Sequence, residues 1–257
     1  MSAATEAHIA PLGANFRRWF YVGMAALFIG TAVSGFLPTS LAKIHAVQVG
    51  QRPPLPPILH LHAVAMGTWL LLLLAQTTLV AVQNTKLHRA LGMASFVVAP
   101  TVLVALVLLV RDEYLLGASF GFREEVSNGL LYKGKSIVLF GTFYLWAVIA
   151  RQRDGETHKR MMVLATIAIL DAALGRMVGY GWLPSLPEPP FVGYDSTHFY
   201  QLLYLAPALV FDTLTRGRPH SAYVIGSVLL LLFMVATHSL WGSSWWLSMA
   251  PRLMGVS

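Results

Sequence analysis

Nine histidines are the residues of this sequence best able to carry chemistry, because the chain has no cysteine. Without thiolates, a bound metal or haem depends on His, Asp, Glu, Met or Tyr, and imidazole is the commonest metal ligand among them. Sorted by expected depth in a bundle of helices, seven of the histidines form an outer layer of His60, His62, His198 and His238 and an inner layer of His88, His158 and His220.

The inner layer predicts a haem site. His88 and His158 each open an apolar segment beside a basic turn, so two neighbouring helices would bring both imidazoles to one iron from opposite sides. Arg89 and Arg160 are the predicted partners of the haem propionates. Basic residues at the cytoplasmic start of a helix are also what membrane topology predicts without any cofactor, and this alternative stays open.

The outer layer predicts a transition-metal site with His62, His198 and His238 as ligands. His62, Trp69 and Gln76 recur every seven residues, so they form one polar stripe down a helix. No His-x-x-x-His or Glu-x-x-His spacing places two ligands on one helix face. The alternative is that isolated histidines make hydrogen bonds between helices.

A second polar face is expected in the segment 197–214. Gln201 and Asp212 share this face with His198, and it is expected to point into the bundle. Pro207 lies between them and is expected to kink the helix, because proline cannot donate a backbone hydrogen bond.

Arg176 lies within an apolar segment and needs a partner, because a lone charge in a membrane is costly. Asp195, a bound anionic substrate and a haem propionate are the predicted partners. Snorkelling of the side chain to the outer headgroups is the alternative. Asp171 points to another face of the same segment, so it is expected to pair with a neighbouring helix.

The composition places these residues in a membrane. Of 257 residues, 56% are hydrophobic and only 11% are charged, whereas soluble domains carry roughly 25% charged residues. This excludes a disulfide scaffold, a disordered chain and an ordinary cytosolic enzyme. The net charge of +7 resides mainly in short turns, where it would meet anionic lipid headgroups, so nucleic acid is not an expected partner.

The expected fold is all-α, a single integral membrane domain over residues 1–257 with seven transmembrane helices. A spanning helix needs roughly 20 mostly apolar residues. Longer loops are expected at 38–57, 111–135 and 180–196, and Lys135 falls in the second of them. The predicted spans are 19–37, 58–83, 88–110, 136–152, 158–179, 197–214 and 221–241.

Basic residues set the expected orientation. The N-terminus and the turns 84–87, 151–157 and 215–220, with the adjoining helix ends, carry more Lys and Arg than the other side, so they are expected to be cytoplasmic. Seven spans then place the C-terminus outside. The cytoplasmic set is Arg17, Arg18, Lys86, Arg89, Arg151, Arg153, Lys159, Arg160, Arg216 and Arg218.

The chain resembles uncharacterised bacterial polytopic membrane proteins that carry a His, Gln and His-Arg-x-x-Gly pattern. The resemblance covers about half of the chain and rests on His62 through Gln76, Leu87-His88-Arg89-Ala90-Leu91-Gly92, His158-Lys159-Arg160-Met161-Met162 and residues 171–176. It implies a multi-pass protein of the bacterial inner membrane.

More distantly, the histidines at helix ends resemble those of transmembrane b-type cytochromes of the ascorbate-reducible kind. This resemblance implies two haems between helix pairs, one held by His88 and His158 and a second with His62 as one ligand. The fourth span departs from that pattern, because it offers Lys135 and Ser136 where a histidine is needed.

Two functional hypotheses follow. In the first, the protein holds haem b or a transition metal and passes electrons within the membrane, to a quinone or another lipid-soluble partner. In the second, it is a non-enzymatic transporter, a receptor-like bundle or an accessory subunit that contacts other membrane subunits. A metal-dependent hydrolase is disfavoured, because no Asp or Glu is placed as a general base beside the histidines.

Overall fold

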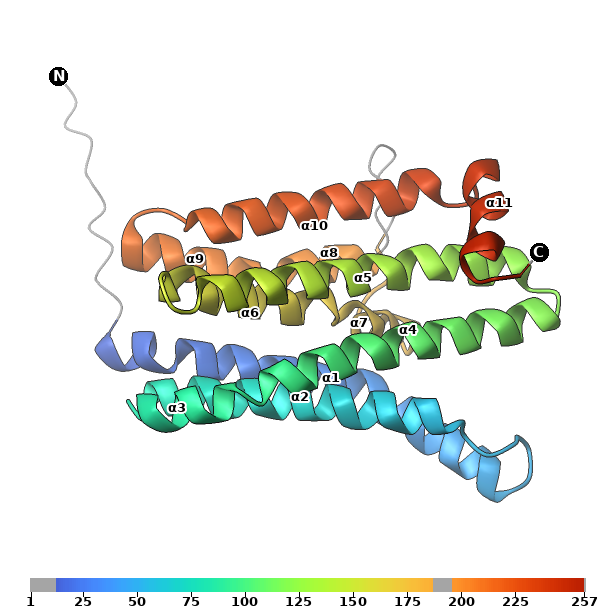
Figure 1. The fold of residues 1–257 in the computed structure, drawn as a ribbon, viewed down its shortest axis with the longest axis horizontal. Helices are drawn as coiled ribbons and strands as arrows, with labels where there is room; N and C mark the ends of the chain where they lie inside the picture. The colour runs from blue at the N-terminus through green and yellow to red at the C-terminus, as the bar shows by residue number, and fades with distance from the viewer. Residues whose placement is uncertain (1–12, 187–195, 257) are drawn as a thin grey trace.

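The structure, a computed structural model, describes residues 13–186 and 196–256. Figure 1 shows a bundle whose long helices run along its longest axis. Within these two ranges the chain is helical and contains no β-strand. The helices are α1 (Ala14–Gln48), α2 (Pro57–Ala81), α3 (Thr85–Gly92), α4 (Ser95–Ser119), α5 (Arg123–Ala150), α6 (Gly155–Ala168), α7 (Asp171–Gly179), α8 (Ser196–Leu203), α9 (Ala206–Arg216), α10 (Ser221–Leu240) and α11 (Ser244–Leu253).

Six helical segments of the described chain are long and apolar enough to cross a membrane, which gives the protein a multi-pass membrane character. They are α1, α2, α4, α5, the combined segment of α6 and α7, and α10. The predicted span 197–214 is not one of them, because it consists of the short helices α8 and α9.

Several helices extend beyond the predicted spans. Helix α1 continues through Pro38 to Gln48, and α5 begins at Arg123 instead of residue 136. The predicted loops 38–57 and 111–135 are therefore wrong over most of their length. Charged residues end the apolar part of a membrane helix, but they are good helix formers and allow the helix to continue past it.

The predicted span 88–110 is divided in two. A turn at residues 93–94 separates the short α3 from the long α4. The Asn84 side chain caps α3 by accepting a hydrogen bond from the Leu87 amide at 3.1 Å. His88 therefore lies in a separate short helix and not at the start of the membrane span.

Two helices are interrupted near each other in the bundle. The α6–α7 segment breaks at Ile169 and Leu170, and the α8–α9 segment breaks at Tyr204 and Leu205. Pro207 occupies the first turn of α9, where its missing amide hydrogen is tolerated. Proline was expected to kink this segment, and the break just before it agrees with that expectation.

The bundle has two distinct ends (Figure 1). The turns at 82–84, 151–154 and 217–220 and the start of α1 lie at one end, which we call the basic end. The connections between α1 and α2 and between α4 and α5 lie at the opposite end, which we call the loop end.

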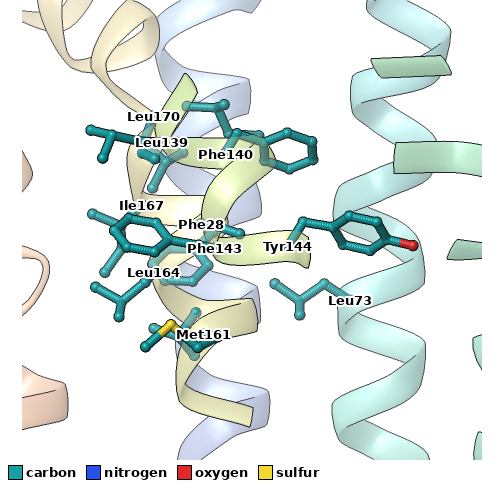
Figure 2. Packing of buried hydrophobic residues seen from close by; sticks show 14 of the residues in the cluster. Phe28, Leu73, Leu139, Phe140, Phe143, Tyr144, Met161, Leu164, Ile167 and Leu170 are labelled. Atoms are coloured by element: carbon teal, nitrogen blue, oxygen red, sulfur yellow. The ribbon is translucent and has the colours of Figure 1, made fainter. Parts of the chain in front are cut away.

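An apolar core fills the region where α1, α2, α5 and α6 meet (Figure 2). Phe28, Leu73, Phe143, Leu164 and Ile167 are each at most 5% exposed there. The combined α6–α7 segment is 67% buried over its most apolar window, more than any other candidate span in the described chain. This segment therefore forms the centre of the bundle and carries the polar groups described next.

Candidate functional site

The first polar group inside the bundle consists of Lys135 and Ser136 from α5, Asp171 from α7 and Gln201 from α8, and we call it the Lys135 cluster. Lys135 Nζ lies 3.4 Å from Asp171 Oδ2 and 3.3 Å from Gln201 Oε1. The Ser136 hydroxyl donates to Asp171 Oδ2. All four residues are at most 5% exposed. The expected pairing of Asp171 with another helix is confirmed.

The break between α6 and α7 positions this cluster. Gln201 Nε2 donates to the carbonyl oxygens of Ile167 at 2.8 Å and Ala168 at 3.2 Å. Asp171 begins α7, and its Oδ1 accepts a hydrogen bond of 2.7 Å from the Ala172 amide. A carboxylate at a helix N-terminus is stabilised by the helix dipole. The break thus fixes the Asp171 carboxylate at the start of α7 and leaves two carbonyl oxygens that accept hydrogen bonds from Gln201.

Aromatic rings border the Lys135 cluster. The Lys135 ammonium lies 4.5 Å from the centre of the Tyr132 ring. The His198 imidazole stacks on the same Tyr132 ring, with 5.0 Å between the ring centres. The predicted inward face of His198, Gln201 and Asp212 is confirmed, because these residues are 3%, 0% and 0% exposed.

The second polar group lies towards the basic end and consists of Glu156, Arg160 and Asp212, and we call it the Arg160 clasp. Arg160 Nε and Nη2 donate to the two Asp212 carboxylate oxygens at 2.8 and 2.5 Å. Arg160 Nη1 donates to Glu156 Oε2 at 2.6 Å. The His220 amide donates to Asp212 Oδ2 at 2.9 Å. Arg160 and Asp212 are 1% and 0% exposed, so the clasp joins α6 to α9 within the core.

The two predicted haem ligands both lie towards the basic end, His88 in α3 and His158 in the first turn of α6. The positive charge of His158 contributes to lowering the pKa of His88, for which burial is the main cause, while the Gln76 carbonyl acts in the opposite direction. His158 Nδ1 donates to the Ala147 carbonyl at 2.9 Å, which leaves its Nε2 available as a ligand. Arg89 is exposed near this site. Arg160 already binds two carboxylates of the chain.

The predicted metal ligands belong to two neighbourhoods. His198 lies close enough to His238 and Lys135 for their charges to act on it. His62 instead lies close enough to Glu113 and Arg176 for their charges to act on it. Across the described residues, no three His, Asp or Glu side chains are grouped so that they could hold a metal ion. The three-histidine site stays a prediction from the sequence.

In the polar stripe of α2, one residue makes a hydrogen bond to another helix, and others have buried polar atoms without a hydrogen-bond partner in the described chain. Trp69 is 1% exposed, and its Nε1 donates to Thr166 Oγ1 at 3.2 Å, which ties α2 to α6. Gln76 differs, because its Oε1 and Nε2 are buried without a hydrogen-bond partner in the described chain. His62 and His88 each have a buried Nδ1 in the same condition.

Arg176 lies on α7, where its Nη1 donates to the Ala172 carbonyl at 2.7 Å and its guanidinium lies 4.4 Å from the centre of the Phe36 ring. Its predicted partner Asp195 lies outside the described residues. A bound anion and a haem propionate stay predictions.

Sequence reasoning missed Lys135 as a site residue by placing it in an outer loop. The structure buries it in α5 at 3% exposure. A signal was present, since Lys135, Leu139 and Phe143 are spaced four residues apart and share one buried helix face. The neighbouring Lys133 and Gly134 concealed this period by making the segment look polar and flexible.

Comparisons of the chain with protein-family models, with curated proteins and with solved structures found no match.

Proposed function

We propose that this protein is a transporter of the bacterial inner membrane and that the Lys135 cluster binds a small polar solute. The supporting observation is the ion pair of Lys135 and Asp171, whose side chains are 1% and 4% exposed, beside two interrupted helices. Ionisable groups inside membrane segments are costly and mark paths for solutes, ions or protons. Secondary transporters commonly bind substrates where helices are discontinuous.

In this proposal the basic end faces the cytoplasm, because the turns there carry most of the short-loop Lys and Arg residues. Helices α8 and α9 together form a seventh crossing, in addition to the six longer segments. The C-terminus then lies on the outer side.

Lys135 and Asp171 can each exchange the other for a charged group of a solute. Lysine carries a compact charge on a flexible stem, so Lys135 can turn from Asp171 towards an anionic group of a solute. Asp171 would keep its hydrogen bonds to Ser136 and to the Ala172 amide while it accepts a cationic group. The breaks at 169–170 and 204–205 allow α7 and α8 to tilt while the Arg160 clasp holds α6 and α9 together.

Reconstituted vesicles test this function. Purified protein in liposomes is offered radiolabelled amino acids, dicarboxylates and inorganic phosphate, and a trapped pH dye reports proton movement. We expect uptake of at least one class above that of empty liposomes. The double variant Lys135→Met with Asp171→Leu should abolish uptake, because it replaces the ion pair by apolar side chains and leaves no lone buried charge.

The matched control is Arg111→Gln with Asp112→Asn, which removes one positive and one negative charge from exposed positions on α4. It should keep the uptake of the wild type. Uptake that persists in the Lys135 and Asp171 double variant, or the absence of uptake in every solute class, would contradict the proposed transport.

A second candidate function is haem binding near the basic end, with a quinone or another lipid-soluble molecule as electron partner. Two observations favour it: His158 Nε2 is left available by the bond from Nδ1 to Ala147, and His88 Nδ1 is buried without a partner in the described chain. His88 and His158 would hold the iron, and the Gln76 amide and Arg89 would bind propionates. A haem b would supply one-electron transfer there.

Optical spectroscopy tests this candidate. Protein purified from haem-supplemented cells should show a Soret band, and either His88→Ala or His158→Ala should remove it. His45→Ala is the matched control, since His45 is exposed near the end of α1. A purified wild-type protein with neither a Soret band nor bound iron would refute haem binding while leaving the transport proposal intact.

A further inference from the structure

Helix α11 differs in direction from the long helices of the bundle. It follows α10 directly, and in Figure 1 it runs across the direction of α10 and α5 at the loop end. Gly242 has a φ of +67°, a backbone conformation that glycine adopts without strain, and it forms the turn between the two helices. The Ser243 hydroxyl caps α11 by accepting a hydrogen bond of 3.3 Å from the Trp246 amide. The chain therefore changes direction at the end of α10 and begins a separate helix.

One face of α11 packs on the first turns of α5. Trp246 and Ala250 lie one helical turn apart and are 8% and 0% exposed. The Trp246 indole Nε1 donates to the Ser127 carbonyl at 2.7 Å, and the Gly242 amide donates to Asn128 Oδ1 at 2.9 Å. These contacts fix the position of α11 along the length of α5.

The lengths of two neighbouring helices place α11 at the surface of a membrane. Helix α10 has 20 residues and starts at the basic end, so it is about 30 Å long and just crosses the hydrocarbon core. On α5, the axis from Ala150 at the basic end to Ser127 measures about 35 Å, which reaches past the core into the headgroup layer. Both helices therefore place α11 at the depth of the lipid headgroups.

The surface of α11 that does not pack on α5 is divided into two parts. Residues four positions apart lie on the same face of a helix. Trp245, Met249 and Leu253 form what we call the α11 apolar stripe, in which Trp245 is 56% exposed and Leu253 is 60% exposed. The α11 polar stripe beside it consists of the exposed residues Ser244, Ser248 and Arg252. Helices that lie between lipid and water have such adjoining apolar and polar faces.

We infer that α11 is an interfacial helix that binds the lipid headgroup layer of the leaflet at the loop end. Its apolar stripe contacts the upper parts of the acyl chains, and its polar stripe faces water. Tryptophan concentrates at this depth of a bilayer, because its ring is apolar and its N–H is polar. Trp241, which follows the last residue of α10, is 51% exposed and lies at the same level as Trp245.

The charge of α11 indicates which property of the lipid matters. Arg252 is its single charged residue, so attraction to anionic headgroups contributes little and contact of apolar side chains with acyl chains provides most of the binding. Uncharged phosphatidylcholine is therefore a sufficient partner. The inference needs the multi-pass membrane character of the protein and does not rest on the proposed transport.

Spin labelling of the full chain tests the inference directly, because the sequence has no cysteine and one introduced cysteine carries the only label. Trp245→Cys and Leu253→Cys report on the apolar stripe, and Ser244→Cys and Ser248→Cys are matched controls on the polar stripe. Each labelled protein is reconstituted in phosphatidylcholine vesicles. The collision rate of the nitroxide with oxygen, which concentrates in lipid, is compared with that for a neutral nickel chelate, which stays in water.

We expect the ratio of oxygen to nickel collisions to be several-fold higher for the two labels of the apolar stripe than for the two controls. Equal ratios at all four positions would place α11 in water and refute the inference. Labels at residues 245 and 253 that are shielded from both reagents would show that a second copy or another protein covers the stripe, which also refutes lipid contact. Two positions on each stripe keep the comparison decisive if one variant fails to fold.

Discussion

The two buried ion pairs of this protein are built differently. In the Arg160 clasp, a planar guanidinium makes two parallel hydrogen bonds to Asp212, and Glu156 takes a third. In the Lys135 cluster, the ammonium lies 3.4 Å from Asp171 and shares its remaining contacts with the Gln201 amide and an aromatic ring. Arginine keeps its charge under all ordinary conditions, whereas a buried lysine changes its protonation more readily.

This difference indicates that one ion pair stabilises the fold and that the other takes part in function. A bidentate pair with its hydrogen bonds satisfied fixes two helices in one geometry, which suits a permanent junction. A longer ion pair with a flexible lysine can exchange partners at lower cost. The clasp is therefore expected to control stability, and the Lys135 cluster is expected to control uptake.

The largest effect is expected from Asp212→Asn. This change removes the negative charge that receives two of the three hydrogen bonds from the buried Arg160 to carboxylates. Breaking a buried pair costs about 3–5 kcal/mol. Thermal and denaturant unfolding in detergent would measure the loss. Asp112→Asn, at an exposed position, serves as control and should change the stability little. Wild-type stability in Asp212→Asn would show that the clasp is not a structural junction.

A smaller loss of stability is expected from Asp171→Asn. Lys135 can release its proton when its counter-charge is removed, whereas Arg160 cannot, so we expect a cost of about 1–3 kcal/mol. Uptake should nevertheless be abolished in the folded fraction. Unfolding curves and vesicle uptake, each normalised to folded protein, provide the comparison. If Asp171→Asn unfolds as readily as Asp212→Asn, the proposed division of roles between the pairs is wrong.

Gln201→Leu should lower the stability by a similar amount, up to about 3 kcal/mol for its three hydrogen bonds. The variant loses the donors to the Ile167 and Ala168 carbonyls and the acceptor of Lys135. Each lost hydrogen bond contributes about 1 kcal/mol. Gln201→Glu is the informative companion, because it keeps an acceptor for Lys135 but removes the donor to the helix break. If both variants lose the same amount of stability, the main role of Gln201 is its hydrogen bonding to the carbonyls at the α6–α7 break and not its contact with Lys135.

The smallest effect concerns pH near the Arg160 clasp. The neutral His220 Nδ1 accepts from the Ala222 amide, and burial, followed by the charges of Arg160 and Arg216, lowers the pKa of His220. The unfolded chain therefore binds this proton more readily, so the contribution of His220 is full above about pH 6.5 and is lost as pH falls through the folded-state pKa.

His220→Asn tests this dependence, because asparagine also caps helices but does not titrate. Unfolding midpoints measured between about pH 8 and pH 5 should fall less steeply in the variant than in the wild type. An identical slope in both proteins would assign the acid sensitivity to other groups, such as His88.

Much of this arrangement follows from the sequence, and the exceptions have physical causes. Apolar length predicted most of the spans, and the spacing of His198, Gln201 and Asp212 predicted their common inward face. Lys135 was misplaced, because local polarity does not reveal which face of a continuing helix is buried. The sequence also did not predict the pairing of Arg160 with Asp212. These residues are 52 positions apart and meet only because α6 packs against α9.

The central position of α6 bears on how the protein is made. This segment carries Arg160 and Asp171, yet it is the most enclosed candidate span of the described chain. Lys135 precedes it in synthesis, so Asp171 can find its counter-charge as soon as the segment inserts. Asp212 emerges from the ribosome 52 residues after Arg160, and until then Arg160 has only Glu156 of its own helix as an acidic partner. The ion pair that joins α6 to α9 can therefore form only after α9 has been synthesised.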